Sequence, residues 1–495
     1  MKEQLPVLVV VVPLLTAPLL VLLRAPAAVR ILSLLAAAAS TAAAVTLALT
    51  VEAPISYHLG GWPPPIGIEY RVTQATAFVL ALVTTIATFS LLLGARGTRS
   101  EVTNGRTHLF YAAFLLCLAG LLGMVVTGDA FNVFVFLEIS SLSTYALVAM
   151  GRRRRAFTAA LNYLILGTIG GTFVLIGIGL LFQMTGTLNA LDIARHMTQA
   201  EVGGTRTVQV AFAFLVVGFG IKLAVFPLHQ WLPNAYAESP SAVSSFLAGT
   251  ATKVIYFQTM RALLVLFGAS YVFGTLRFGL FLGVLSLLGM FAGSLAAIYQ
   301  TSLKRLLAYS SIGQVGYLTL ALSFGSEAGT YAGLLHMGAH AITKTALFVV
   351  AAAIVSGVGT DRIDALAGLG KRLPLCAFAF VLGGLGLIGV PGTAGFVSKW
   401  ALLEAALADG HLGYAAALLL SSLLAVVYVW RVVEVMYFRQ PPPDAPAARG
   451  LRGYDWGALG PALVLMVASI LLGVWSSPIT GYVRTAATQL FRGGL

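Results

Sequence analysis

The sequence has 495 residues, of which 59% are hydrophobic and only 9% are charged. This composition excludes a soluble globular protein and is typical of an all-α membrane protein with many spans. The formal net charge of +13 does not indicate nucleic-acid binding, because the basic residues are scattered over short loops between apolar segments, as membrane topology requires.

Apolar stretches of about 20 residues predict transmembrane helices along the whole chain. The first two follow each other closely, so we interpret the first as a retained span rather than a cleaved signal peptide. Two later spans contain helix-breaking residues and are predicted to be broken, 208–231 at Pro227 and 373–404 at Pro391 and Gly392. The sequence thus predicts fourteen helices, near 5–23, 31–51, 72–94, 108–127, 130–150, 160–184, 208–231, 241–265, 272–299, 306–325, 328–356, 373–404, 411–438 and 457–482.

Basic residues are distributed unevenly between the two ends of these helices. If successive loops alternate sides, 17 of the 30 Lys and Arg residues lie on one face and eight on the other, the rest lying within spans. The positive-inside rule then places the first face in the cytoplasm and both termini outside.

No soluble domain is predicted, because the loops are short and the longest, around 185–207 and 439–456, contain mainly turn and charged residues. Helices 4–8 and 9–13 form two blocks of five, each with its broken helix in fourth place. An odd number of spans inverts the second block, as in inverted-repeat transporters, whose ion sites lie near the breaks. We expect one membrane domain, 1–495, divided into helices 1–3 (1–107), a first repeat (108–271), a second repeat (272–438) and helix 14 (439–495).

An ionisable pair is predicted near the first break. Lys222 lies in the apolar part of its span, where a lysine costs roughly 2.5–3.5 kcal/mol and persists only with a partner, a water-filled cavity or a function. Pro227 releases a backbone carbonyl nearby, which is tolerated where protein or water faces the break. Glu138 lies mid-helix in another span, and pairing would make its proton affinity depend on the charge of Lys222. Both a switchable pair and a static buried ion pair fit this pattern.

Further basic groups lie in later spans. Lys253 is too central in its helix to reach the interface easily, and desolvation makes a neutral, proton-accepting lysine accessible. His336, His340 and Lys344 recur at i, i+4 and i+8 on one helical face, a spacing that suits proton hopping through water. A histidine pair bonded to carbonyls is the structural alternative. We expect no metal, because no third Cys, His or acidic ligand is evident.

The second break carries the last group of the candidate relay. Four glycines surround the proline there, Lys399 follows on the second half of the span, and Glu404 lies about a turn and a half further on as a candidate supporting residue. We expect the terminal proton exchange here, the alternative being a packing kink with a structurally held lysine. His229 and Trp231, after the first break, are interpreted as supporting or interfacial packing residues. Glu238 is expected to cap the following helix.

Several motifs surround these residues. They are Phe136-Leu-Glu138, Gly220-Ile-Lys-Leu-Ala-Val-Phe-Pro-Leu-His-Gln-Trp-Leu-Pro233, Pro240-Ser-Ala-Val-Ser244, Ala248-Gly-Thr-Ala-Thr-Lys253, Leu306-Leu-Ala-Tyr-Ser-Ser-Ile-Gly-Gln-Val-Gly316 and Gly392-Thr-Ala-Gly-Phe-Val-Ser-Lys399. Together they resemble the proton-translocating antiporter-like subunits shared by complex I, membrane-bound hydrogenases and Mrp-type cation/proton antiporters. The loop Gly60–Glu69 and the extent of the chain are similar to the D-type subunits of Mrp complexes.

The resemblance implies a proton-translocating subunit of a multisubunit monovalent cation (Na+)/proton antiporter in a prokaryotic cytoplasmic (inner) membrane. Its partners would be other membrane subunits, with lipids around them and with protons and Na+ as transported ions. The implied proton path contains Glu138, Lys222, Lys253, His336, His340, Lys344 and Lys399.

Two other functions fit the same sequence. One is an antiporter-like proton-pumping subunit of a complex I-like NADH dehydrogenase or a membrane-bound hydrogenase. The other is a structural membrane subunit with a vestigial relay. In each case we expect a subunit with no redox centre or cofactor of its own, because Cys117 and Cys376 lie separately in apolar segments and form no iron–sulfur or haem motif.

Overall fold

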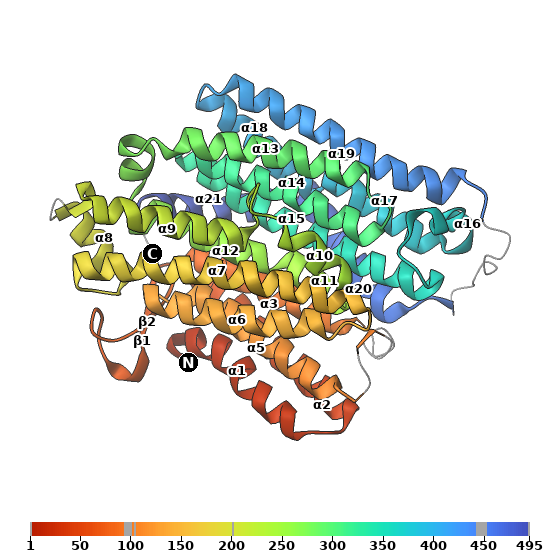
Figure 1. The fold of residues 1–495 in the computed structure, drawn as a ribbon, viewed down its shortest axis with the longest axis horizontal. Coiled ribbons are helices and arrows are strands. Elements are labelled where there is room, and N and C mark those ends of the chain that lie inside the picture. Colours follow the sequence, from red (N-terminus) through yellow and green to blue (C-terminus); the bar gives the residue numbers. More distant parts are fainter. Residues whose placement is uncertain (1, 94–100, 103–104, 200–201, 442–452, 494–495) are drawn as a thin grey trace.

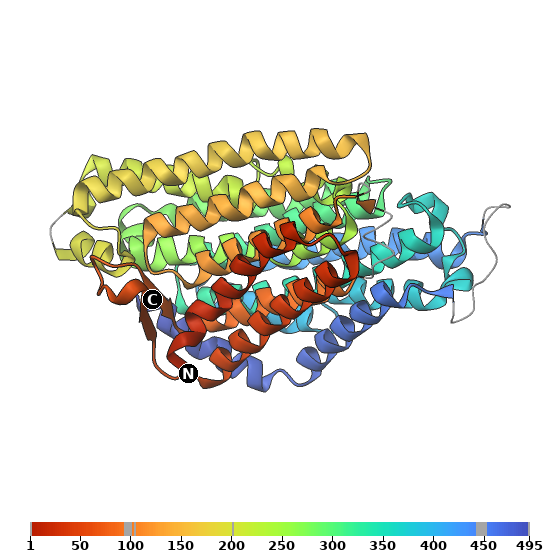
Figure 2. The same ribbon diagram turned by 90° about the horizontal axis from the view of Figure 1, so that it is seen from below.

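The computed structural model describes residues 2–93, 101–102, 105–199, 202–441 and 453–493. The longest helices lie side by side along the long axis of the molecule (Figure 1). The two ends of the chain lie toward one end of this bundle and α16 (Leu369–Arg372) lies at the other, in both views (Figures 1 and 2). The fold is therefore the all-α polytopic architecture that the composition predicts.

The elements follow one another with short connections. The first half of the chain contains α1 (Leu5–Leu22), α2 (Pro26–Thr50), β1 (Ile55–His58), β2 (Glu69–Val72), α3 (Gln74–Leu92), α5 (Thr107–Val126), α6 (Ala130–Ala149), α7 (Arg154–Thr185), α8 (Ala190–Gln199), α9 (Arg206–Leu223), α10 (Trp231–Glu238) and α11 (Ser241–Gly249). The second half contains α12 (Ala251–Arg261), π-helical turns at Ala262–Leu266 and Ser270–Thr275, α13 (Phe278–Ile298), α14 (Leu303–Ser323), α15 (Glu327–Val358), α16, α17 (Pro374–Ile388), α18 (Ala394–Ala408), α19 (Leu412–Phe438), α20 (Trp456–Val474) and α21 (Ser477–Phe491).

Eleven helices in the described part of the chain are long and apolar enough to cross a membrane. The three other predicted spans correspond to α11 with α12, to α14, and to α17 with α18. Two of these are divided, and α14 buries Ser310, Ser311 and Gln314 against its neighbours. Such polar residues lower the mean hydropathy of a helix. They do not prevent it from spanning the membrane, because they face the bundle interior rather than lipid. The count of fourteen stays a prediction.

Some predicted boundaries differ from the structure. The last predicted span, 457–482, is two helices, because the backbone leaves helical geometry at Trp475 and Pro478, in the first turn of α21, has no backbone N–H to continue α20. The predicted loop 185–207 contains α8. An antiparallel hairpin, pairing Ile55 with Val72 and His58 with Glu69, lies in the segment before α3 that was predicted only as a loop.

Helix α15 lies at the centre of the bundle. It packs against α11, α12 and α14, which precede it in the sequence, and against α17, α18 and α20, which follow it. Each predicted block of five has a divided helix in fourth place, α9 with α10 and α17 with α18. The inverted relation between the blocks stays a prediction. Both α14 and α15 of the second block pack against helices of the first.

Candidate functional site

The first break follows Leu223, the residue after Lys222. Helix α9 ends at Leu223, Ala224 has a left-handed backbone (φ 62°), and helical structure resumes at Trp231. Pro227 lies within the interruption, as predicted, since it has no N–H for a helical hydrogen bond. His229 lies there too, with its ring stacked on Phe226 at 5.3 Å between centroids.

The structure brings Lys222 and Glu138 together. Lys222 Nζ donates to Ser141 Oγ at 2.7 Å, to Glu138 Oε1 at 3.4 Å and to Tyr145 OH at 3.5 Å. The Lys222 side chain is 3% exposed, whereas that of Glu138 is 25% exposed. The predicted pair therefore has its base in the protein interior and its acid at the edge of the bundle.

Ser141 and Tyr145 are partners that the sequence prediction missed. They lie three and seven residues after Glu138 in α6, so all three share one face of the helix. The spacing of these three residues in the sequence is sufficient to predict that shared face. The hydroxyls give the ammonium neutral acceptors in addition to the carboxylate.

Trp231 holds the break. It is 1% exposed, so it packs within the protein, and its depth in the membrane stays a prediction. Its indole N–H donates to the carbonyl of Ile221 at 2.8 Å, and its ring stacks on Tyr163 at 4.0 Å between centroids. The indole thus adds a side-chain donor to a carbonyl in the last turn of α9, which also accepts from the Ala224 backbone N–H at 3.1 Å.

Lys253 is completely buried near the start of α12. Its ammonium donates to the carbonyl of Ala248 and to Thr252 Oγ1 at 3.3 Å. No ion pair to it is formed by the residues that the structure describes. Lys253 is therefore held by neutral oxygens alone, which distinguishes it from Lys222.

The predicted face of α15 is buried and continuous. His336 Nδ1 lies 3.0 Å from Ser398 Oγ of α18, and the His336 and His340 rings are nearly parallel at 6.0 Å between centroids. Lys344 Nζ donates to the carbonyl of Leu307 at 2.8 Å and to Ser310 Oγ, both of α14.

The imidazoles of this face are incompletely bonded by protein. His336 Nε2 and both ring nitrogens of His340 have no hydrogen-bond partner among the described residues. Buried polar atoms are normally paired with protein or with ordered water. We therefore expect water beside these rings, which the proton-hopping interpretation requires.

The second break is stabilised by Lys399. Helix α17 ends before Gly389 (φ 88°), Gly392 (φ 87°) follows the exposed Pro391, and α18 begins at Ala394. Lys399 Nζ donates to the carbonyls of Leu387 and Ile388, at 3.1 and 2.9 Å, and to Ser422 Oγ at 3.1 Å. It also lies 4.8 Å from the centroid of the Tyr317 ring. The ammonium thus satisfies carbonyls released by the break.

Two acidic residues lie elsewhere than the sequence prediction implies. Glu404 is exposed and accepts a hydrogen bond from Trp400 Nε1 at 2.7 Å, so the structure does not bring it to Lys399. Glu238 ends α10 and approaches Arg153 at 4.0 Å. The expectation that Glu238 caps the next helix is wrong, because Glu101 accepts from the first backbone N–H of α11.

The described residues contain no group of three or more His, Cys, Asp and Glu side chains placed to hold a metal ion.

Basic groups buried beside two broken helices define this chain as a polytopic membrane protein organised around a series of ionisable side chains. A family model described as NADH:quinone oxidoreductase/Mrp antiporter, TM, matches residues 127–425. The chain belongs to this family, which confirms the resemblance drawn from its motifs.

Relatives in the family span nearly the whole chain. The NADH-quinone oxidoreductase subunit N of Desulforudis audaxviator is 40% identical over 500 residues, with 97% of each chain covered. The D-type subunit of the Na(+)/H(+) antiporter of Bacillus subtilis is 29% identical over 493 residues, with 98% of this chain and 96% of the relative covered. Among solved structures, a chain of the Mrp complex from Dietzia sp. DQ12-45-1b matches with a TM-score of 0.91 and 25% identity, over 99% of this chain and 97% of that one.

Proposed function

We propose that this chain is the proton-translocating subunit of a multisubunit monovalent cation (Na+)/proton antiporter. The observation that carries the proposal is the contact between Lys222 and Glu138 at the first break, together with the buried Lys253 and Lys344 and the half-buried Lys399. Uncompensated basic groups at such depth are costly and mark ion or proton pathways. The likeness to the D-type antiporter subunit of Bacillus subtilis and to a chain of the Mrp complex supports the proposal.

The relay would work by changing one electrostatic contact. When Glu138 and Lys222 separate, Lys222 loses its stabilising charge and passes a proton toward Lys253. His336, His340 and Lys344 carry it along α15, and Lys399 exchanges it with one aqueous side. Small side-chain movements suffice, because the carboxylate is already 3.4 Å from the ammonium.

A cargo site for an organic solute has less support. The cavity beside the first break has a volume of about 240 Å³ and is lined by apolar side chains, including Phe226, Pro227 and Phe281, with only the hydroxyls of Thr259 and Thr319 as polar groups. Solute sites combine such surfaces with several convergent polar groups.

The chain would lie in the cytoplasmic membrane of a prokaryote, with both termini outside and with other membrane subunits of the complex beside it.

The proposal is tested by Lys222→Ala in the assembled complex, reconstituted in proteoliposomes with a Na+ gradient and an internal pH dye. We expect cation-driven proton movement to fall at least about tenfold, as for loss of a group that transfers protons directly. The exposed Lys371→Ala serves as the control and should retain wild-type transport. Full transport by Lys222→Ala would refute the relay.

A subunit of a redox-driven proton pump is the second candidate, favoured by the 40% identity to subunit N of an NADH-quinone oxidoreductase. The same relay would then be driven by electron transfer in other chains. The proteins that copurify with a tagged chain decide between the two. Small hydrophobic antiporter subunits support the antiporter, and iron–sulfur proteins support the redox pump.

A further inference from the structure

Helix α11 is a short buried helix with a charged side chain at each end. All nine residues from Ser241 to Gly249 are buried. At 1.5 Å per residue the helix is about 13 Å long. Its N-terminus lies at the end of the bundle that the charge distribution places toward the cytoplasm, and its C-terminus adjoins Lys253, a member of the proposed relay.

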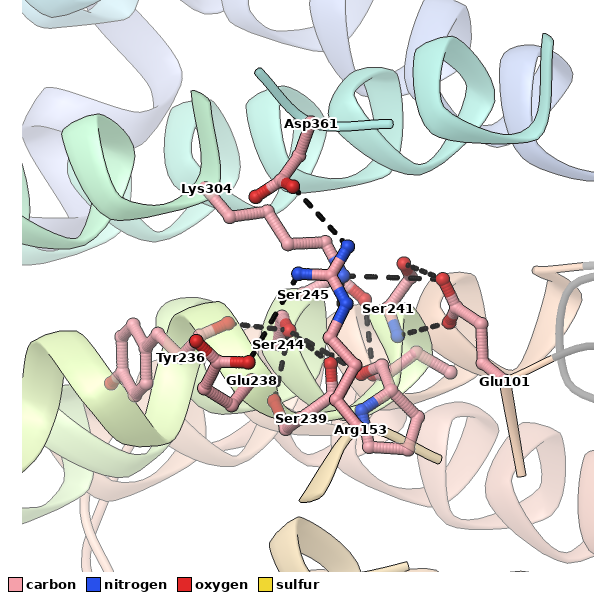
Figure 3. A network of polar contacts seen from close by, with 12 residues as sticks. Glu101, Arg153, Tyr236, Glu238, Ser239, Ser241, Ser244, Ser245, Lys304 and Asp361 are labelled. Carbon is pink, nitrogen blue, oxygen red and sulfur yellow. Dashed lines mark hydrogen bonds and ion pairs between the residues drawn. The ribbon is translucent and has the colours of Figure 1, made fainter. Parts of the chain in front are cut away.

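Glu101 occupies the N-terminal end of α11. Its Oε2 accepts from the Ser241 backbone N–H at 2.5 Å, and its Oε1 accepts from Ser241 Oγ at 2.7 Å (Figure 3). The N-cap residue, Pro240, supplies no side-chain cap. A carboxylate from a distant part of the sequence therefore satisfies a free N–H and complements the positive end of the helix dipole.

Lys253 occupies the opposite end. Its ammonium turns back to the carbonyl of Ala248, one of the last carbonyls of α11. This carbonyl belongs to the negative end of the helix dipole, where a cation is favoured. The two side chains are thus linked through one rigid helix with a charge of the favourable sign at each end.

A second basic side chain opposes Glu101. Lys304, near the start of α14, places Nζ 4.0 Å from Glu101 Oε1 and donates to the carbonyl of Ser239 at 3.5 Å. Arg153 lies beside this pair but interacts with Glu238 and Asp361, at 4.0 and 3.2 Å (Figure 3). At the other end, Lys253 lies near enough to His336, His340 and Lys344 of α15 to interact with them electrostatically.

From this arrangement we infer that Glu101 is a positioning residue for Lys253 and acts on it through α11. We infer also that the positive charge of Lys304 reduces this effect of Glu101. The inference rests on the proposed function, in which Lys253 accepts and releases protons. Glu101 favours the ammonium form of Lys253 by fixing α11 and by adding a negative charge at its far end. Lys304 lies next to that charge and reduces its effect. The pair therefore sets the pH range over which Lys253 exchanges protons.

Substitutions of Glu101 and Lys304 should change the proton affinity of Lys253 in opposite directions. In Glu101→Gln the amide still bonds Ser241, but the negative charge at the N-terminal end of α11 is lost, so Lys253 holds a proton less readily. In Lys304→Gln the carboxylate is left unopposed, so Lys253 holds a proton more readily. A unit charge about 14 Å away in partly screened protein corresponds to a shift of roughly 0.5–1 pH unit.

The experiment measures the pH profile of cation-driven proton movement in proteoliposomes of the assembled complex. We expect the profile of Glu101→Gln to move to lower pH and that of Lys304→Gln to move to higher pH, with Glu101→Asp close to wild type. Glu434→Gln is the control, since Glu434 is a partly exposed acid that pairs with Arg439 at 3.2 Å and its loss changes the net charge equally. This control should not shift.

The outcomes separate the inference from the proposed function. If the wild-type complex moves no protons in response to a cation gradient, the proposed function is wrong. If the wild type is active but the two variants shift in the same direction, or neither shifts, the inference is overturned. If Glu101→Gln does not assemble, the Lys304→Gln profile decides alone, because a purely structural cap gives Lys304→Gln no reason to shift to higher pH.

Discussion

Lys222 lies closer to the hydroxyl of Ser141, at 2.7 Å, than to the carboxylate of Glu138, at 3.4 Å. The ammonium is therefore bonded to a neutral oxygen that stays with it when the carboxylate moves away. A contact of this kind lowers the cost of opening the ion pair, because the buried lysine keeps a hydrogen-bond acceptor.

Removing that hydroxyl should slow transport without abolishing it. In Ser141→Ala, Lys222 keeps only Glu138 and Tyr145 as partners, and the pair separates at a higher cost. We expect turnover to fall by about fivefold, which corresponds to one hydrogen bond of ~1 kcal/mol. The measurement is proton movement in proteoliposomes. Ser143→Ala is the control on the same helix, since Ser143 bonds only the carbonyl of Ile139 among the described residues. Equal transport rates for both variants would show that the Ser141 hydroxyl has no role in transport.

Gly171 of α7 leaves room for the Glu138 carboxylate. A Cβ at this position would lie 2.1 Å from Glu138 Oε1, so Gly171→Ala must displace the carboxylate. We expect transport to fall several-fold while the complex still assembles, because the contact to Lys222 is lost rather than the fold. Gly179→Ala is the control for the glycine substitution itself, since no atom of the described residues lies within 4 Å of a Cβ there. A defect of similar size in both variants would contradict the steric explanation.

Gly395 permits the close crossing of the second broken helix. A Cβ there would lie 1.9 Å from the carbonyl oxygen of Gly386, a backbone atom that cannot rotate away. Gly395→Ala should therefore destabilise the protein by about 1–3 kcal/mol, as overpacking does. A lower unfolding temperature in detergent would be the readout. The control is Gly460→Ala on α20, where a Cβ meets no described atom within 4 Å. An unchanged unfolding temperature would mean that the break relaxes freely.

Asp361 gives the complex an acid-sensitive contact outside the spans. Burial alone would raise the pKa of Asp361, but the hydrogen bond from Ser302 and the charges of Arg153 and Lys304 outweigh it and lower that pKa. The stabilisation is thus complete above the ordinary aspartate pKa of about 4 and is lost as the pH falls through the lowered value.

We therefore expect Asp361→Asn to be less stable than wild type at neutral pH, with the difference shrinking below about pH 4. Unfolding temperatures across a pH series would measure this. The exposed Asp364→Asn serves as the control, because Asp364 pairs only loosely with Arg362 at 3.8 Å. A difference between Asp361→Asn and wild type that persists at low pH would show that the charge of Asp361 is not the cause.

The helices and both breaks could be predicted from the sequence because their signals are local. Apolar length defines a span, and proline or glycine beside Lys222 and Lys399 marks an interruption. The spacing of His336, His340 and Lys344 likewise fixes a shared helical face before any tertiary packing is known. The roles of the candidate relay residues stay predictions.

The partners of these groups could not be predicted in the same way. Glu101 lies 140 positions before Ser241, and no periodicity connects a carboxylate to a distant helix end. Glu238 was the nearer candidate for the cap, but α10 continues through it. Glu404 follows Lys399 closely in sequence, yet the turn of α18 directs it to Trp400. Side-chain direction across packed helices decides these contacts.

The row from His336 to Lys344 has a consequence for energy coupling. Eight residues of helix rise about 12 Å, and α15 is one of the helices able to cross the membrane. A proton carried along that row would cross roughly two-fifths of a hydrocarbon core of about 30 Å. It would then gain or lose about 0.9 kcal/mol for every 100 mV of membrane potential. Transfer between Glu138 and Lys222 covers only a few ångströms, so the voltage dependence of transport would arise mainly in α15.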